Sequence, residues 1–114
     1  MNWLKFVNAI SMVESSGDSD AVGDNGQAIG AFQMHPEVLI DVGNIYGTHF
    51  QDKDRLNSSI SAAVCVLYVS WYAKEERIGH KPTEKDYALC WHYGPSFYKI
   101  EDCHGYWDKV QKYI

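Results

Sequence analysis

The 114-residue chain has a net charge of −5 and no cluster of lysine or arginine, which argues against binding nucleic acid through phosphate contacts. Its length suits one domain with a single core, residues 1–114, and leaves no room for a separate binding module. Four Trp and eight Tyr are a high aromatic content, which suits stacking on sugar rings as well as core packing.

The first predicted helix covers about Asn2 to Ser15. Trp3, Val7 and Ile10 recur at helical spacing, and Glu14 continues the same face. The Glu14 carboxyl should therefore point toward the core, where lost hydration of its charged form raises its pKa. It would then still hold a proton near neutral pH, as a general acid must. The alternative is that Glu14 turns to solvent or caps a backbone amide in the last helical turn.

A glycine-rich loop follows this helix and ends in Gly30-Ala31-Phe32-Gln33. Within it, Asp24-Asn25-Gly26 is a strong tight-turn signal that predicts the tip of a small hairpin. A second helix is predicted to begin near Pro36, which suits a first helical position, and to stop by Gly43 to Gly47.

The third predicted helix, from about Ser58 to Ile78, is apolar nearly all round, so we expect it to be central and buried. The next begins after Thr83, a plausible cap with Asp86 three residues on, and runs to Gly94-Pro95. A short last helix holds Tyr106, Trp107, Val110 and Tyr113. The predicted fold class is mainly α: one helical domain with a buried central helix and at most one small β-hairpin.

The three cysteines, Cys65, Cys90 and Cys103, resemble neither a zinc site nor a disulfide framework, which fits folding in a reducing cytosol. Cys65 and Cys90 are expected to be small buried hydrophobes. The five histidines include no His-Glu-x-x-His pair, so no metal and no cofactor is expected. Cys90 and His92 point in different directions at a helix end, which disfavours a thiol nucleophile.

The order of motifs resembles that of the soluble lytic transglycosylase and goose-type lysozyme superfamily over nearly the whole chain. The first family motif is a helix-ending Glu-Ser, here Glu14-Ser15, and the second is Gly-hydrophobic-hydrophobic-Gln, here Gly30-Ala31-Phe32-Gln33. The third is an alanine-rich core helix with a polar start, here residues 57–63. The fourth, Ala-Tyr-Asn-x-Gly, reads Cys90-Trp91-His92-Tyr93-Gly94, so Trp91 replaces the tyrosine and His92 the asparagine.

The resemblance implies a lysozyme-like α+β fold and cleavage of the MurNAc–GlcNAc β-1,4 bond of bacterial peptidoglycan, with Glu14 as general acid and base. The residues implied to shape or wall the sugar groove are Ser15, Gly30, Phe32, Gln33, Trp91, His92 and Tyr93. In the family the tyrosine of the fourth motif hydrogen-bonds the acid, and here either His92 or Tyr93 would supply that contact. For Gln33, capping the second helix is the alternative role.

Two reaction courses stay open. Lytic transglycosylases use a single acid that then acts as base, while the 6-hydroxyl of the substrate attacks and leaves a 1,6-anhydro sugar. Hydrolysis by inversion needs a second carboxylate about 6.5–9.5 Å away. Among Asp18, Asp20 and Asp24, the last is best placed, at the predicted hairpin tip. An Asp before Asn-Gly is also what a tight turn prefers for local reasons.

The alternative from another class is a non-catalytic glycan-binding or phage structural module, against which the retained Glu14 and Gln33 argue. The first apolar run is broken by Asn8 and Ser11, so no signal peptide is predicted, and no stretch is long enough to insert in a membrane. We expect a monomer made in the cytoplasm. It would act on the cell wall, as a phage endolysin released through a holin or as part of a phage particle.

Overall fold

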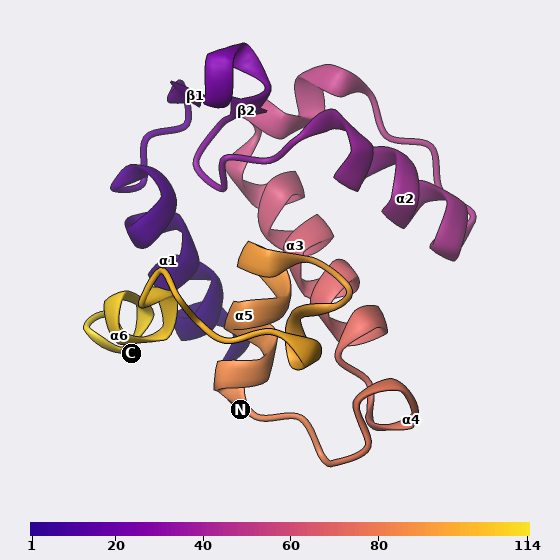
Figure 1. Ribbon diagram of the computed structural model, residues 1–114. Coiled ribbons are helices and arrows are strands. Elements are labelled where there is room, and N and C mark those ends of the chain that lie inside the picture. The colour runs from indigo at the N-terminus through magenta and orange to yellow at the C-terminus, as the bar shows by residue number, and fades with distance from the viewer.

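Helix α3 (Ser58–Tyr72) runs through the middle of the molecule in the computed structural model, which describes residues 1–114 (Figure 1). The other helices are α1 (Trp3–Ser15), α2 (Pro36–Tyr46), α4 (Glu75–Ile78), α5 (Glu84–Tyr93) and α6 (Tyr106–Gln111). Strands β1 (Val22–Gly23) and β2 (Ala28–Ile29) and the 3₁₀ helices η1 (Asp24–Gly26), η2 (Asp52–Leu56) and η3 (Phe97–Lys99) complete the fold. The predicted mainly helical class with one small hairpin is confirmed.

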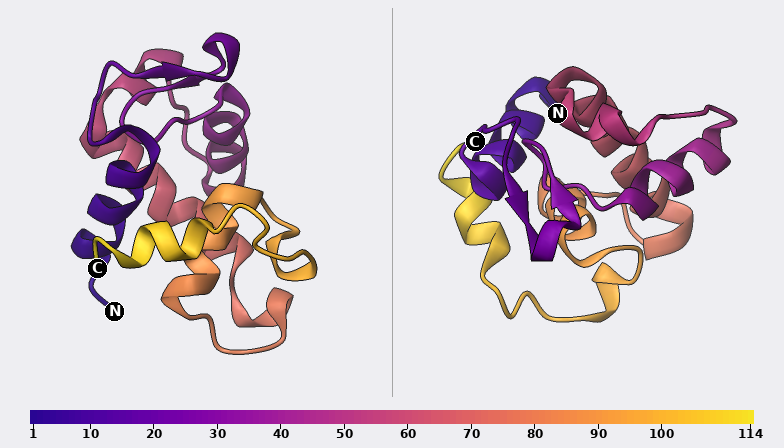
Figure 2. Two further views of the ribbon diagram at one scale, coloured as in Figure 1. Left: turned by 60° about the vertical axis from the view of Figure 1, so that its left-hand side comes forward. Right: turned by 90° about the horizontal axis from the view of Figure 1, so that it is seen from above.

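The elements pack at the two ends of α3. The β1–β2 hairpin, η2 and α2 lie toward its beginning, while α4, α5 and α6 lie toward its end (Figures 1 and 2). A single cluster of 20 buried residues joins the two ends into one core. Cys65 and Cys90 are fully buried within it, as expected, whereas Cys103 is exposed. None of the helices combines the length and the apolar character needed to cross a bilayer.

Helix α1 begins and ends as the sequence predicts. The Asn2 side chain caps its start by accepting a hydrogen bond from the Lys5 amide at 3.1 Å. At its end, Ser16 adopts a left-handed conformation with φ of 58°. Phe6 and Ile10 are buried, and Glu14 follows on the same side, about one turn beyond Ile10. The apolar stripe thus anchors the helix and sets the direction of the Glu14 side chain.

The hairpin forms at the predicted place. Val22 pairs with Ile29 and Gly23 with Ala28 in an antiparallel ladder. Asp24 and Asn25 both have positive φ, of 48° and 56°, a conformation that Asp and Asn tolerate better than other side chains. The tight-turn signal therefore marks the real tip of the hairpin.

The two strands are so short that Arg55, in η2, holds the segment in place. The Arg55 side chain is 6% exposed, and its guanidinium donates 2.8 Å hydrogen bonds to the carbonyls of Gln27 and Met34. Asp52 balances the charge at 2.8 Å. A buried charge of this kind needs several acceptors, and the two carbonyls among them tie η2 to the segment from the hairpin to Met34.

The third predicted helix is shorter than expected. It was expected to reach Ile78 but ends at Tyr72, because Lys74 is extended, with φ of −65° and ψ of 149°, and α4 is a separate turn. The Arg77 guanidinium donates to the Tyr72 carbonyl at 2.8 Å, which replaces a helical partner. Helix α3 is central as predicted, although its Ala63 and Trp71 side is exposed.

Helix α5 begins with the predicted cap. The Thr83 hydroxyl accepts from the Asp86 amide at 3.3 Å, and the Asp86 carboxylate accepts from the Thr83 amide at 2.9 Å. These two bonds are a reciprocal capping box. The helix ends at Tyr93, where Gly94 takes φ of 86°. This end carries Trp91 and His92 to the same region as the end of α1.

Candidate active site

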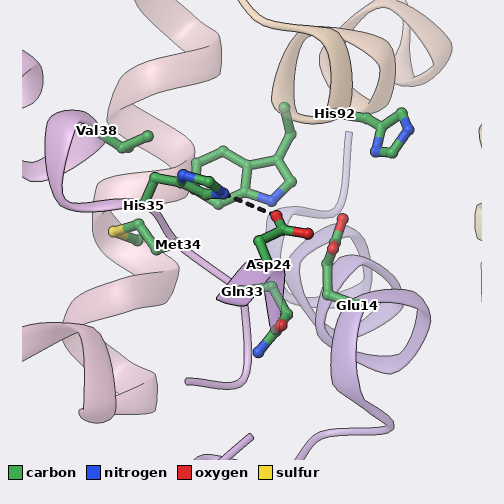
Figure 3. A pocket seen from close by; sticks show the side chains of 8 residues that line it. Glu14, Asp24, Gln33, Met34, His35, Val38 and His92 are labelled. Atoms are coloured by element: carbon green, nitrogen blue, oxygen red, sulfur yellow. Dashed lines mark hydrogen bonds and ion pairs between the residues drawn. The ribbon is translucent and has the colours of Figure 1, made fainter. Parts of the chain in front are cut away.

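A cleft of about 350 Å³ opens where the end of α1, the hairpin, the start of α2 and the end of α5 meet (Figure 3). Its lining residues are Glu14, Asp24, Gln33, Met34, His35, Val38, Trp91 and His92. Four separate parts of the chain therefore contribute to one open site. No group of three or more histidine, cysteine or acidic side chains is arranged to hold a metal ion.

Glu14 is half-buried, and its carboxyl group accepts one side-chain hydrogen bond, from the Tyr106 hydroxyl to Oε2 at 2.7 Å. Burial raises the pKa of Glu14 above its ordinary value, and this outweighs the lowering by the Tyr106 hydrogen bond. The negative charge of Asp24 raises the pKa further, while Lys109 lowers it. Glu14 therefore keeps its proton to a higher pH than a solvated glutamate, which suits a proton donor.

Tyr106 is a site residue that the sequence did not reveal. It is 2% exposed at the start of α6, and 92 residues separate it from Glu14. The expectation that His92 or Tyr93 bonds the acid was wrong, because the Tyr93 hydroxyl donates to Asp102 and the His92 imidazole contacts His104. No local pattern marks Tyr106, since its partner comes from the packing of α6 against α1.

Removing the Tyr106 hydroxyl should raise the pKa of Glu14. In Tyr106→Phe the ring remains, but the carboxylate loses the hydrogen bond that favours its charged form, so its proton is held to a higher pH. The measurement is a pH titration of the Glu14 carboxyl carbon by NMR. Tyr113→Phe, at an exposed tyrosine of the same region, is the control and should leave the titration in place. An unchanged or lowered pKa in Tyr106→Phe would contradict the assignment.

Asp24 is the second carboxyl group of the cleft. It lies at the hairpin tip, its side chain is 69% exposed, and its Oδ2 atom is 2.9 Å from His35 Nε2. Figure 3 shows its carboxyl group beside that of Glu14, and its charge acts on the Glu14 pKa. Asp18 and Asp20 do not line the cleft. Asp24 is thus both the turn residue and the only aspartate that faces the acid.

Gln33 lines the cleft beside Glu14, below Asp24 in the view of Figure 3. Its side-chain amide donates to the carbonyls of Ala21 at 3.2 Å and Gly30 at 3.0 Å, so both donor hydrogens serve the loop. The amide oxygen accepts no hydrogen bond within the chain and lies against Gly23, where an ideal Cβ would come within 2.4 Å of it. Gln33 does not cap α2, where His35 occupies the capping position without a side-chain bond.

Trp91 and His92 form the wall contributed by α5. Phe32, expected in the groove, is 3% exposed and does not line it. Its ring instead packs edge-on against Trp91, with centroids 6.3 Å apart and planes at 90°. Phe32 therefore supports the wall from behind. Tyr93 also lies outside the cleft, bound to Asp102.

Ser15 and Gly30 do not line the cleft but position the backbone around it. The Ser15 hydroxyl donates to the Ala31 carbonyl at 2.7 Å, which ties the end of α1 to the loop after β2. Gly30 was expected to permit close approach of a sugar. It permits close approach of η2, because an ideal Cβ at Gly30 would lie 2.0 Å from the Arg55 carbonyl oxygen.

Backbone strain is concentrated beside the cleft. The non-glycine residues with positive φ are Ser16, Asp24, Asn25 and Gln33, and all four belong to the segment from the end of α1 to the start of α2. Such conformations cost energy and persist where the surrounding contacts enforce them, most often at functional sites. The same segment supplies half of the residues that line the cleft.

No protein-family model matches the chain, and neither the curated proteins nor the solved structures give a match. A proposal for its function rests on the geometry of the cleft together with the resemblance in sequence motifs.

Proposed function

We propose that the chain cleaves the β-1,4 bond between MurNAc and GlcNAc in peptidoglycan, with Glu14 as general acid and then base. The observation that carries the proposal is the half-buried Glu14 carboxyl group, its pKa raised mainly by burial, in an open cleft beside Asp24. Glycosidases need an acid that is still protonated when the substrate binds. The bacterial cell wall is the corresponding place of action.

In the first step Glu14 gives its proton to the bridging oxygen as the bond from MurNAc C1 to that oxygen breaks. The positive charge that develops on the sugar ring is stabilised by the carboxylates of Glu14 and Asp24. Trp91 offers an aromatic wall to a sugar ring, and the Gln33 oxygen can accept from a hydroxyl or acetamido group.

In the second step Glu14, now ionised, acts as the base. Tyr106 supports this form, because burial raises its pKa so far that it remains a donor at all relevant pH values. Its hydrogen bond to Glu14 becomes charge-assisted once the carboxyl group is ionised. In the lytic course the MurNAc 6-hydroxyl attacks C1, gives its proton to Glu14, and leaves a 1,6-anhydro product.

Hydrolysis is the second candidate course, and the position of Asp24 favours it. Asp24 reaches the same cleft as Glu14, and His35 restrains its carboxylate at 2.9 Å. A carboxylate so placed can activate water for attack on C1, and the product would then be a reducing sugar. The lytic course, which the motif resemblance implies, requires no such base.

Mass spectrometry of the fragments that the protein releases from purified peptidoglycan distinguishes the two reaction courses. We expect products ending in 1,6-anhydro-MurNAc, one water lighter than the hydrolytic products, and an Asp24→Asn variant that still forms them. Hydrolysis would instead give reducing ends, and Asp24→Asn would lower turnover about 10²-fold or more. Asn tolerates positive φ and so preserves the turn, and Asp20→Asn, outside the cleft, is the matched control.

A third result bears on the proposal itself. If neither the wild-type protein nor Asp20→Asn releases soluble fragments from several types of wall, and sedimentation shows that the protein binds those walls, the chain is a glycan-binding module. The general-acid role of Glu14 would then be wrong.

A further inference from the structure

Two histidines meet beside the candidate acid. His92, at the end of α5, and His104, just before α6, place Nε2 and Nδ1 at 2.8 Å from each other. A hydrogen bond between two imidazole nitrogens needs one nitrogen with hydrogen and one without. The pair can therefore carry one positive charge and keep its bond. With a second charge, both facing nitrogens carry hydrogen and like charges repel, so the contact must break.

Tyr106 links the histidine pair to Glu14. The His92 ring lies flat on the Tyr106 ring, with centroids 4.1 Å apart and planes only 8° from parallel. The Tyr106 hydroxyl in turn makes the one side-chain hydrogen bond that Glu14 accepts. A change in the position of His92 therefore removes one face of the packing that holds the Tyr106 ring against the acid.

Hydrogen bonds that do not involve the imidazoles connect the backbone on the two sides of the pair. Asp102 accepts hydrogen bonds from the Tyr93 hydroxyl at 2.7 Å and from the amides of Tyr106 at 2.9 Å and Trp107 at 3.0 Å. The Tyr93 hydroxyl accepts from the His104 amide at 3.0 Å. These bonds attach the start of α6 to the end of α5 whatever the charge of the histidines.

Burial and neighbouring positive charge both disfavour a proton on His92. Burial lowers the pKa of His92 below its ordinary 6.5, and His104 and Lys109 lower it further, while Asp102 acts the other way. Other titratable groups around the pair include Tyr93 on α5, Cys103 in the preceding loop, Tyr106 on α6, Glu14 on α1, and the Asp24–His35 pair across the cleft. A proton on His92 in addition to one on His104 thus has to be added against burial and like charge, and it would break the hydrogen bond of the pair.

We propose that His92 and His104 are positioning residues that hold Tyr106 against Glu14 while they share a hydrogen bond, and that double protonation of the pair releases this hold. The consequence for catalysis, a loss of turnover on the acid side that is separate from the titration of Glu14, rests on the proposed function. The coupling between the histidines and Tyr106 does not.

Two variants at His104 separate the bond from the charge. In His104→Gln the amide can still hydrogen-bond His92 but cannot become a cation. In His104→Phe the bulk remains and the hydrogen bond is lost. His49→Gln, at an exposed histidine on the far side of α2, is the control for a change of overall charge.

The first measurement is an NMR titration of the imidazole protons and of the Tyr106 ring protons, which sense the stacked His92 ring. It is made in the Glu14→Gln background so that the acid contributes no titration of its own. We expect the Tyr106 resonances to shift together with the second protonation of the pair. This shift should disappear when His104→Gln is added to the Glu14→Gln background, and it should remain when His49→Gln is added. Tyr106 resonances that do not follow the histidines, or that follow them equally with Gln at position 104, would overturn the proposal.

The second measurement is the pH profile of peptidoglycan turnover with Glu14 in place. We expect the acid limb of kcat to lie about one pH unit lower in His104→Gln than in the wild-type protein, the size of a close like-charge effect. His104→Phe should lower kcat about fivefold at neutral pH, with little change in KM, which corresponds to one hydrogen bond of about 1 kcal/mol. Acid limbs that coincide would overturn the role in turnover.

The two measurements fail independently. If the Tyr106 resonances follow the histidines but no glycan is cleaved, the role of the histidine pair is supported and the proposed function is wrong. If glycan is cleaved but the Tyr106 resonances do not follow the histidines, the proposed function is supported and the role of the histidine pair is wrong.

Discussion

Glu14→Gln should lower the release of soluble fragments from peptidoglycan by about 10²–10⁴-fold, the usual contribution of a general acid. The amide is nearly isosteric with the carboxyl group, and its oxygen can still accept the Tyr106 hydrogen bond seen at 2.7 Å. The fold should therefore remain, while no proton is available for the bridging oxygen. Glu101→Gln, at an exposed glutamate, is the control and should cleave as the wild-type protein does. Turnover of Glu14→Gln within tenfold of wild type would refute the role of Glu14.

The same substitution should not destabilise the protein at neutral pH. Because the folded-state pKa of Glu14 is raised above its ordinary 4.5, the folded state holds this proton more tightly than the unfolded state does. The resulting stability is fully present below pH 4.5 and is lost as the pH rises through the folded-state pKa. At pH 7 Glu14→Gln should thus match or exceed the wild-type melting temperature, with the advantage disappearing in acid. A clear loss of melting temperature at pH 7 would contradict this.

Gly30→Ala should have the largest effect on stability, a loss of about 3 kcal/mol or more in the free energy of unfolding, from backbone strain and overpacking together. Gly30 has φ of +85°, and a Cβ there would lie 2.0 Å from the Arg55 carbonyl oxygen. That oxygen belongs to the backbone of η2, which Arg55 itself ties to the hairpin, so it cannot move without disturbing the cleft.

The matched control is Gly26→Ala, because Gly26 has φ of +89° but nothing within 4 Å of its ideal Cβ. It carries the backbone cost alone, about 1–2 kcal/mol. Urea unfolding of both variants at neutral pH measures the difference. Equal losses in the two variants would show that the contact with Arg55 does not matter. Because Gly30 also accepts the Gln33 amide, Gly30→Ala should lower turnover as well.

The elements could be predicted wherever their signal is local. Asn2 and Thr83 cap helices through bonds to residues three positions away, and Asp24-Asn25-Gly26 makes its turn with its own backbone. The direction of Glu14 likewise follows from helical spacing to Ile10. These features depend on near neighbours, which the sequence shows directly.

The parts that could not be predicted depend on distant neighbours. Arg55 follows Asp52 by three positions in a charged stretch, where an exposed side chain would be expected. Only its contacts with Gln27 and Met34 explain its burial. Phe32 has the place of a groove residue in its motif, yet Trp91 covers it. Both outcomes follow from how separate elements pack, which no pattern within either element records.

The partner of the acid shows the same limit most sharply. Tyr106 was placed in the last helix by its apolar neighbours, but its hydroxyl reaches across 92 residues to Glu14. The degenerate fourth motif drew attention to His92 and Tyr93 instead. His92 stacks on the Tyr106 ring, and the Tyr93 hydroxyl and the Tyr106 amide both donate to Asp102, so the motif indicated the right region and the wrong donor.

The contact between α1 and α6 also sets the order in which the site can come into being during synthesis. A ribosome makes Tyr106 92 positions after Glu14, so a nascent chain that has emerged only as far as α5 holds the acid without its donor. Contacts of such high sequence separation are the ones whose loop-closure entropy is met late in folding. An assembled Glu14 environment therefore requires α6 to be made and packed against α1, and its appearance on refolding should report that long-range contact.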